Sequence, residues 1–477
     1  MIWAVIVGLL VSAVWFAASR DQSGDGAPVP SPSAITATRP APEACQDLLQ
    51  ESSESAAADD LTLTSANVVT MEGQKRASQV VIRSGLIEST EDPTSSGTKA
   101  IDLGGATVLP GFIDSHSHWI GDRALVSDSA SQAIDSALAQ GWTSISELFV
   151  NEQRLNELCA LQRDGDLRLK VGAFLPINYE FQRFGRWYES FEPGQVFGPH
   201  LFLQGIKIFA NRATDGLGYQ TDPPDPGVQG RLFWEPDELA AEIGHAHEAG
   251  WQIAVHATDD GGLDLVLDAF EQIEPPDIAA ARHRIEHASI VRDDQVERIA
   301  DLGLIASIQH SWFHSDAASD LVRWLGRDRL TFTGRWRNLI VAGIPLAGGT
   351  DRPWAIVGES GDSIDAITFG VTRRGPSGDR PPRWMAAQRL TVWEVLRSIT
   401  IDAAFAQGTE EAVGSIKPGK AADLVILSAD PTRVRPQDLR KIKVLATIVD
   451  GQVEYCGPST PRDLRLLCPA GTKASVP

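Results

Sequence analysis

Six residues of metal-ligating or acid/base type stand near the ends of short apolar segments in this sequence. They are His116, His118, Lys207, His256, His287 and Asp351. Imidazole nitrogens and carboxylate oxygens are ligands that divalent cations accept in proteins. If the apolar segments are parallel strands of one barrel, their carboxyl ends meet at a common mouth, and no long loop is needed to bring the six side chains together. This distribution predicts metal-dependent hydrolytic or acid/base chemistry.

His116 and His118 are two residues apart in the motif His-Ser-His. Side chains at positions i and i+2 of a strand share a face, so both imidazoles can approach one cation. The alternative is a pair of unrelated polar histidines, because this motif alone is common. Asp114 falls on the same face and can support the ligands from behind.

Lys207 lies inside the apolar run GIKIF, where an ammonium group would be costly to bury. One interpretation is a lysine that reaches out from a strand end or pairs with a carboxylate. The other is a lysine neutralised by burial, which reacts with CO2 to give a carbamate that bridges two metal ions.

The remaining candidates also end strand-like segments. His256 ends QIAVH and His287 ends HRIEH, and each alone is as typical of a core histidine as of a ligand. Period two places His283 on the face of His287 but at the opposite end of the strand, where we expect a structural role. Asp351 follows LAGGT, whose small residues allow close backbone approach and leave the carboxylate accessible.

Eight strands can be placed in the middle of the chain, and several are followed by helical patterns. They are TVLPGFIDSH (from Thr107), TSISELF (Thr143), RLKVGAFL (Arg168), GIKIFA (Gly205), QIAVHA (Gln252), HRIEHA (His283), LIASIQH (Leu304) and IPLAGGTD (Ile344). This alternation predicts an α/β fold with a (β/α)8 barrel over residues 107–413. An open, doubly wound sheet would give the same alternation.

The two ends of the folded part are rich in short strand patterns. Segments near 61–102 and the later ADLVILS and VLATIVDGQVEY predict a small β-sandwich built from residues 60–106 and 414–456, with a tail over 457–477. Cys456 and Cys468 are close in sequence and would staple this tail, and Cys45 can pair with Cys159. Four cysteines allow three pairings, and free buried thiols are the alternative.

The first residues predict export. Residues 2–18 are an almost unbroken apolar run, so residues 1–19 are either a secretory signal peptide or a membrane anchor. Residues 20–59 are rich in small and polar residues and predict a disordered linker. The barrel is then expected in the periplasm, free or anchored to the membrane. A net charge of −21 over 477 residues argues against nucleic-acid binding, which needs clustered Lys and Arg.

The motifs VLPGFIDSHSH, GIKIFA, VHA with RHRIEHAS, GTDRPW and GSIKPGKAADLVILSADP occur in this order. With them the chain resembles the amidohydrolase superfamily, and most of all its YtcJ-like branch (amidohydrolase family 3), from about Leu61 to Tyr455. The resemblance implies a TIM-like barrel with two divalent metal ions, usually zinc. By motif, the histidines 116, 118, 256 and 287 are ligands, Lys207 is the bridging carbamate, and Asp351 is both ligand and proton-transfer base.

Three departures accompany the resemblance. HATDDGG stands where the branch has HAIGDRA, FANR stands where it has FADG, and only about 25 residues separate His118 from the next strand. These changes flank the expected pocket. The resemblance therefore supports the assignment of the catalytic residues better than the assignment of any substrate.

The expected function is hydrolysis of a C–N, amide-like bond of a small molecule. A mononuclear deaminase of the same superfamily and a non-catalytic metal-binding scaffold are the alternatives, and Lys207 argues against the deaminase. Trp119, Trp312 and Trp354 suggest an apolar or aromatic substrate group, with core packing as the other use. His310 and His314 follow the seventh strand and are candidates for orienting the substrate.

Overall fold

Eight parallel strands form a barrel in the middle of the chain. The computed structural model describes residues 42–50, 60–91, 97–122, 127, 129–212, 231–273, 275–354 and 362–469. The barrel strands follow chain order, and each pairs in parallel with the next. They are β8 (Phe112–Ser117), β9 (Trp142–Glu147), β10 (Lys170–Pro176), β14 (Leu201–Phe209), β17 (Gln252–Ala257), β18 (Arg284–His287), β19 (Ile305–Gln309) and β20 (Leu346–Gly349).

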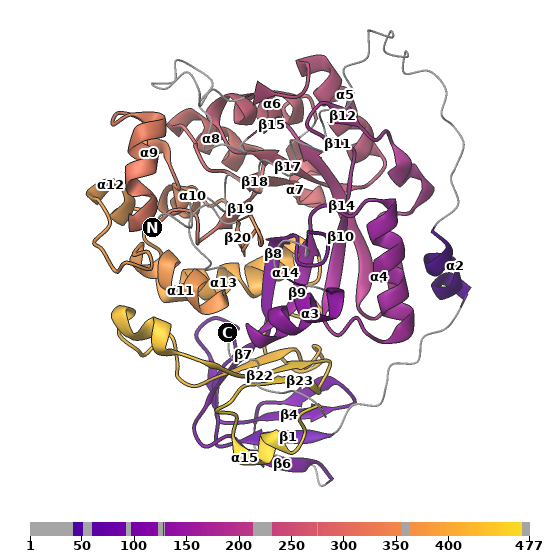
Figure 1. Ribbon diagram of the computed structural model, residues 1–477, viewed down its shortest axis with the longest axis vertical. Coiled ribbons are helices and arrows are strands. Elements are labelled where there is room, and N and C mark those ends of the chain that lie inside the picture. The colour runs from indigo at the N-terminus through magenta and orange to yellow at the C-terminus, as the bar shows by residue number, and fades with distance from the viewer. Residues whose placement is uncertain are drawn as a thin grey trace. The chain divides into compact units, whose positions relative to one another are not determined.

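The barrel closes between its last and first strands, β20 and β8 (Figure 1). Just beyond β20, the Asp351 N–H donates to the carbonyl of His116 at 2.7 Å, and the His118 N–H donates to the carbonyl of Arg352 at 2.9 Å. A Cβ on Gly349 would lie 2.5 Å from the backbone nitrogen of His116, so the close approach of the strands needs glycine there. The predicted barrel is confirmed, and the open sheet is excluded.

Helices cover the outside of the barrel and bury apolar side chains against the strands (Figure 1). Helix α4 (Glu152–Asp164) begins at Asn151, whose side chain accepts the Arg154 N–H, and ends at Gly165 in the left-handed conformation. The other helices are α3 (Ala130–Ala139), α5 (Pro236–Glu248), α6 (Asp260–Phe270), α7 (Pro275–Ala281), α8 (Asp293–Asp301), α9 (Ala318–Leu325), α10 (Trp336–Val341), α11 (Ser363–Thr372), α12 (Arg383–Ala386), α13 (Val392–Ser398) and α14 (Ile401–Gln407).

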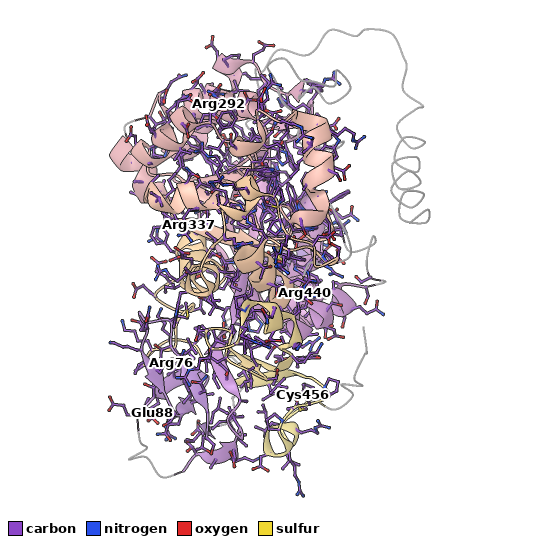
Figure 2. The ribbon with its side chains drawn as sticks, turned by 90° about the vertical axis from the view of Figure 1, so that its left-hand side faces the viewer. Arg76, Glu88, Arg292, Arg337, Arg440 and Cys456 are labelled. Carbon is purple, nitrogen blue, oxygen red and sulfur yellow. A yellow bond between two sulfur atoms is a disulfide. The ribbon has the colours of Figure 1, made fainter. Side chains whose placement is uncertain are left out.

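Arginine side chains tie neighbouring elements together on the surface. Arg292, at the start of α8, reaches Asp264 of α6 at 2.8 Å, and Arg337 of α10 reaches Glu394 of α13 at 2.6 Å. Figure 2 labels both arginines. Such ion pairs are partly exposed, and each contributes little to the stability of the fold. Burial of the apolar helix faces is therefore what holds the helices in place.

A small domain of two sheets is built from both ends of the chain. One sheet contains β1 (Leu61–Thr64), β4 (Val80–Arg83), β5 (Leu86–Ser89) and β6 (Lys99–Asp102). The other contains β2 (Asn67–Val69), β3 (Arg76–Ala77), β7 (Thr107–Pro110), β21 (Leu424–Leu427), β22 (Val444–Val449) and β23 (Gln452–Cys456). Apolar residues of both sheets share one core, and Arg76 pairs with Asp430 at 2.8 Å across the two chain ends.

The segment TVLPGFIDSH forms two strands, and the prediction of one barrel strand from Thr107 is wrong. Strand β7 lies between β2 and β21 in the small domain, and the barrel begins at Phe112 on β8. Gly111 separates them, and a Cβ at this position would lie 2.1 Å from the Oγ1 of Thr143. The chain therefore crosses from one domain to the other at a point where only glycine fits.

Helix α2 (Glu43–Gln50) lies within the segment for which a disordered linker was predicted. Cys45 forms a disulfide with Cys159 of α4, and the Ala44 N–H donates to the side chain of Asn156 at 3.1 Å. The linker prediction is therefore wrong for these residues, because a covalent bond and burial of Ala44 and Cys45 fix them on the barrel. The rest of residues 1–59, apart from Pro42, lies outside the described residues.

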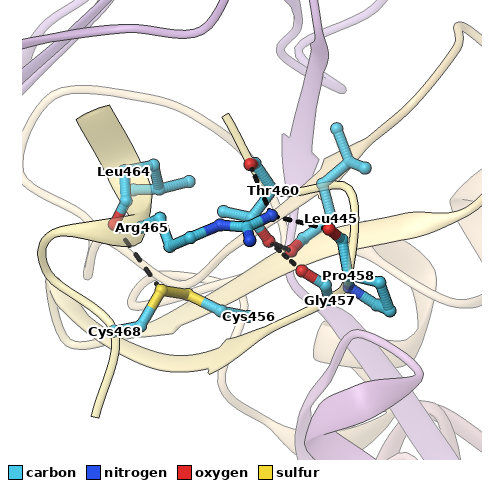
Figure 3. Close-up of a disulfide and its surroundings, with 8 residues drawn as sticks. All are labelled: Leu445, Cys456, Gly457, Pro458, Thr460, Leu464, Arg465 and Cys468. Carbon is cyan, nitrogen blue, oxygen red and sulfur yellow. Dashed lines mark hydrogen bonds between the residues drawn. A yellow bond between two sulfur atoms is a disulfide. The ribbon is translucent and has the colours of Figure 1, made fainter. Parts of the chain in front are cut away.

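The C-terminal tail packs on the small domain. Cys456 and Cys468 form a disulfide, and between them α15 (Arg462–Arg465) buries Leu464 in the core of the two sheets (Figure 3). Arg465 donates to the carbonyl of Pro458 at 2.6 Å. The structure thus decides among the pairings that the sequence left open, and all four cysteines take part in these two disulfides. None of the described helices is long and apolar enough to cross a membrane, and the apolar run over 2–18 lies outside them.

Candidate metal centre

Three of the predicted ligands converge at the mouth of the barrel. The Nε2 atoms of His116 and His118 lie 3.2 and 3.3 Å from the Oδ1 of Asp351. One ligand atom from each of these residues lies within 4.8 Å of the others, and all three side chains are buried. The HxH pair comes from the end of β8 and Asp351 from just beyond β20, so closure of the barrel makes this group.

The other three predicted ligands line the adjoining space. The ring of His287 lies 4.6 Å from that of His116 and 4.5 Å from that of His256, between centroids. Lys207 on β14 is fully buried, and its charge interacts with Asp351 and with His256. The structure thus brings all six predicted residues to one cluster, in which His256 is half-buried and the other five are buried. The tightest convergence is at His116, His118 and Asp351.

Burial keeps two of the histidines neutral. It lowers the pKa of His287 to about 3, with help from His116, and it lowers the pKa of His256 well below the usual range, with help from His287. A neutral imidazole has a lone pair to give to a cation. For Asp351, burial alone would raise the pKa, but His116, His118 and His287 outweigh it and hold the pKa well below the usual range. This carboxylate is therefore ionised.

The cluster fits a divalent cation because it contains buried nitrogens without partners. Burial lowers the pKa of Lys207 to about 8, although Glu286 and Asp351 act in the other direction. Among the described residues, neither the Nζ of Lys207 nor the Nε2 of His256 has a hydrogen-bond partner. Buried polar atoms are normally satisfied, so these two atoms indicate that a bound group completes the site.

The backbone holds two of the candidate ligands in left-handed conformations. His287 has φ of +76°, Ala288 of +42° and Asp351 of +53°. Such conformations cost on the order of 1–3 kcal/mol each for residues other than glycine, and they cluster at functional sites. Here they turn the side chains that follow β18 and β20 back toward the mouth of the barrel.

Residues 122–455 match the sequence profile of the family described as the amidohydrolase family. The chain belongs to this family. YtcJ of Bacillus subtilis (strain 168) is 31% identical over 277 residues, which cover 57% of this chain and 50% of that protein. N-substituted formamide deformylase of Arthrobacter pascens is 29% identical over 264 residues, 52% of this chain and 45% of that protein. The chain spans about half the length of these curated relatives.

Solved structures share the fold of this amidohydrolase. An uncharacterized metal-dependent hydrolase from Pyrococcus horikoshii OT3 has a TM-score of 0.67 and 23% sequence identity, and the match covers 79% of this chain and 99% of that one. At this identity the likeness concerns the fold alone.

Glu286 is a residue of the site that the sequence did not reveal. Its carboxylate contacts the Nδ1 of His116 at 2.5 Å and accepts from the Nε of Arg284 at 2.7 Å, and both residues are fully buried. Arg284 also donates to the carbonyl of Ser115 at 2.6 Å, so β18 directs Arg284 and Glu286 into the barrel. The predicted alternation, which placed His287 on the face of His283 and Ile285, is therefore wrong at this strand.

Asp114 supports the loop that carries Asp351, as its position on the face of the HxH pair suggested. Its carboxylate accepts from the backbone N–H and the hydroxyl of Thr350, at 2.8 and 2.6 Å, and from the indole of Trp119 at 2.9 Å. Burial raises the pKa of Asp114 to about 6. Trp119 is itself buried, so it packs behind the site and does not face a substrate.

The candidate substrate residues differ in their positions. Trp312 stacks on His287 with 4.7 Å between ring centroids, and Trp354 is 45% exposed and donates to Asp122 at 2.9 Å. His310 is buried beside the hydroxyl of Ser398 at 3.3 Å. His314 is buried, stacks on Phe369 and accepts the Asp316 N–H. A substrate role stays a prediction for all four, and Trp312 and Trp354 have the more favourable positions.

Proposed function

We propose that this protein is a metal-dependent hydrolase that cleaves the C–N bond of an amide-like group in a small molecule. The observation that carries the proposal is the buried cluster itself: His116, His118 and ionised Asp351 converge beside neutral histidines and an unpartnered Lys207. One relative is named as an N-substituted formamide deformylase, which supports an amide-type bond.

The six residues can hold two divalent ions, for which we expect zinc. Histidine and carboxylate donors suit this metal, and a carboxylated Lys207 would add an anionic ligand between the two histidine pairs. When bound, the ions supply an activated water at neutral pH and polarise the scissile carbonyl. Burial lowers the pKa of the Lys207 amine to about 8, so the uncharged amine that reacts with CO2 is more available near neutral pH than in an exposed lysine.

Asp351 is the residue that we assign to proton transfer. Hydrolysis adds an oxygen to the carbonyl carbon, breaks the C–N bond and requires a proton on the leaving nitrogen. The Asp351 carboxylate is buried at the mouth and ionised, so it can take the proton of the attacking water and deliver it to that nitrogen. Glu286 holds His116 through its Nδ1, which keeps the Nε2 directed toward Asp351.

Elemental analysis of the purified protein tests the metal proposal. We expect two divalent ions per chain, and a single ion after growth with added zinc would favour the mononuclear deaminase. A protein that binds metal and turns over nothing would favour the scaffold. A screen of amides, lactams, carbamates, esters and dipeptides on the zinc-loaded protein then tests the bond class, and dipeptides as the sole substrates would contradict it.

Two variants distinguish the proposed role of Lys207 as a metal ligand from that of Asp351 as a general base. Lys207→Ala should lose metal and activity together, and short carboxylic acids should restore part of both by filling the vacated space. Asp351→Asn should keep much of the metal while kcat falls by about 10²–10⁴-fold, the scale for losing a general base. Lys420→Ala is the matched control, because Lys420 is also a buried lysine but donates to the carbonyl of Val413 at 3.0 Å. Full metal and activity in Lys207→Ala would refute the carbamate.

We also propose that the protein is exported. The apolar run over 2–18 and the Gly/Pro/Ser-rich stretch that follows it support this, and so do the two disulfides, because disulfides persist mainly in oxidising compartments. The periplasm, with or without a membrane anchor, is the location that we expect.

A further inference from the structure

Four aromatic side chains form a cluster at the mouth of the barrel, on the side of Lys207 and His256. They come from the end of β14, from the segment after β9 and from the hairpin of β11 (Asn178–Tyr179) and β12 (Gln182–Arg183) that follows β10. They are Phe149, Tyr179, Phe184 and Phe209, and we call them the aromatic wall. Their ring centroids are 5.5–6.1 Å apart with interplanar angles of 65–78°. This edge-to-face packing is favourable, so the wall has a defined shape.

The aromatic wall adjoins the candidate metal centre directly. The ring of Phe209 lies 5.3 Å from the ring of His256, and the Nζ of Lys207 lies 4.9 Å from the centroid of Phe209. Phe209 is the last residue of β14 and stands two residues after Lys207. A molecule whose reacting group lies at the metal ligands would therefore have its next group against these rings.

The four rings are only partly buried, unlike the aromatic residues that fill the core. Phe112, Trp142 and Phe174 are fully buried, whereas each ring of the wall keeps part of its surface accessible. Apolar surface that stays accessible beside a buried polar site is typical of substrate recognition, because a bound apolar group removes it from water. The faces of aromatic rings add a preference for another ring over an aliphatic group of similar size.

We propose that the substrate carries an uncharged aromatic group that packs against the aromatic wall while its amide-like bond lies over the metal ligands. This inference rests on the proposed function for the position of the scissile bond. It makes Tyr179 and Phe184 specificity-determining residues that contact the substrate without taking part in the chemistry. Trp119, which the sequence also suggested, is buried behind the site and takes no part in this recognition.

The same hairpin offers a matched control. Phe181 is 49% exposed and packs against Phe233, with 5.1 Å between ring centroids, and under the guanidinium of Arg231 at 4.4 Å. It has the same side chain as Phe184 and lies in the turn between β11 and β12, but its ring contacts lie outside the wall. A change at Phe181 should therefore leave selectivity unchanged.

The test compares three amides on the zinc-loaded full-length protein: N-benzylacetamide, N-(cyclohexylmethyl)acetamide and N-acetylglycine. We expect kcat/KM for the benzyl compound to exceed that for the cyclohexyl compound by about 3- to 10-fold, the scale of an aromatic pair. The charged compound should be the poorest substrate. Tyr179→Leu and Phe184→Leu should each reduce the benzyl preference toward unity with unchanged zinc content and melting temperature, and Phe181→Leu should retain it.

Binding of the same three compounds, followed by ligand-observed NMR, separates this inference from the proposed function. If no amide is hydrolysed but the benzyl compound binds and loses binding in Phe184→Leu, the wall recognises aromatic groups and the proposed reaction is wrong. If the amides are hydrolysed without preference, or if the leucine variants keep the preference, the reaction stands and the aromatic inference is overturned. If one variant misfolds, the other decides.

Discussion

Replacing Glu286 by glutamine removes one negative charge from the buried pair with Arg284 while keeping the size of the side chain. The native carboxylate serves two partners, the Nδ1 of His116 at 2.5 Å and the guanidinium of Arg284 at 2.7 and 3.0 Å. Burial would raise the pKa of Glu286, but Arg284 and His116 outweigh it and hold the pKa well below the usual range. The carboxylate is thus ionised and fully used, because its Oε2 serves both partners and its Oε1 accepts from the Nε of Arg284. In the glutamine variant an NH2 group, which donates and cannot accept, takes the place of one of these two oxygens.

The expected loss of stability follows from the burial of both partners. Removing one member of a buried ion pair costs about 3–5 kcal/mol, because the other charge stays buried. Arg284 would keep its hydrogen bonds to the carbonyl of Ser115 at 2.6 Å and to the hydroxyl of Ser307 at 3.2 Å. We therefore expect a loss of stability at the lower end of this range, about 3 kcal/mol. His116 would lose the carboxylate that fixes its ring, and loss of such a partner lowers metal affinity by about 10- to 100-fold.

Denaturant unfolding of protein from which a chelator has removed the metal measures the loss of stability. Competition with a chromophoric chelator measures the loss of metal affinity. The double variant Arg284→Met with Glu286→Gln removes the unpaired cation as well. It should recover most of the unfolding free energy but not the metal affinity, because His116 still lacks its anionic partner. Metal affinity within about twofold of the native value in Glu286→Gln would refute the idea that this carboxylate orients His116.

Three further predictions concern regions outside the site. Burial and His247 lower the pKa of His283 from 6.5 to about 3, so below pH 6.5 the unfolded chain binds a proton that the folded protein does not. This group should therefore lower the free energy of unfolding by about 2 kcal/mol between pH 7 and pH 5. In denaturant titrations, His283→Asn should lack that part of the decrease. Serine at Cys45 and Cys159, 114 residues apart, should cost about 2 kcal/mol more unfolding free energy than serine at the pair 12 apart, and equal losses would contradict this loop-entropy estimate. A fusion of residues 1–60 to a reporter active only outside the cytoplasm should be active, and intact but silent fusion protein would refute export.

The convergence of the six candidate ligands could be predicted from the sequence because their positions depend on the fold class more than on its details. Residues at the carboxyl ends of parallel strands meet at one mouth in any barrel, so HxH on β8 and single residues on other strands sufficed. Glu286 was missed for a local reason. Strict alternation places it opposite His287, but His287 has φ of +76° and leaves the regular strand, so neighbouring side chains both reach the site.

The aromatic wall was beyond sequence reasoning for a different reason. Phe149 and Phe209 are 60 positions apart, and the hairpin that carries Tyr179 has no motif that fixes its path. Their convergence depends on hydrogen bonds between distant segments, such as that from the side-chain amide of Asn178 to the carbonyl of Phe209 at 2.9 Å. The prediction of one barrel strand from Thr107 was wrong for a similar reason. The chain passes from the small domain to the barrel at Gly111, and this crossing depends on contact with Thr143, which lies on another strand.

Charge inside the barrel explains why Lys207 is central to the proposed chemistry. Arg284 offsets the charge of Glu286, His256 and His287 are neutral, and Asp351 is the one ionised carboxylate among the six candidate ligands. One anionic ligand gives little compensation for two divalent ions in a buried site. Carboxylation converts the amine of Lys207 into a second anion at the place where the uncompensated charge would lie. The lysine is therefore expected to gain its modification together with the metal, which is why its loss should empty the site while the loss of the base should not.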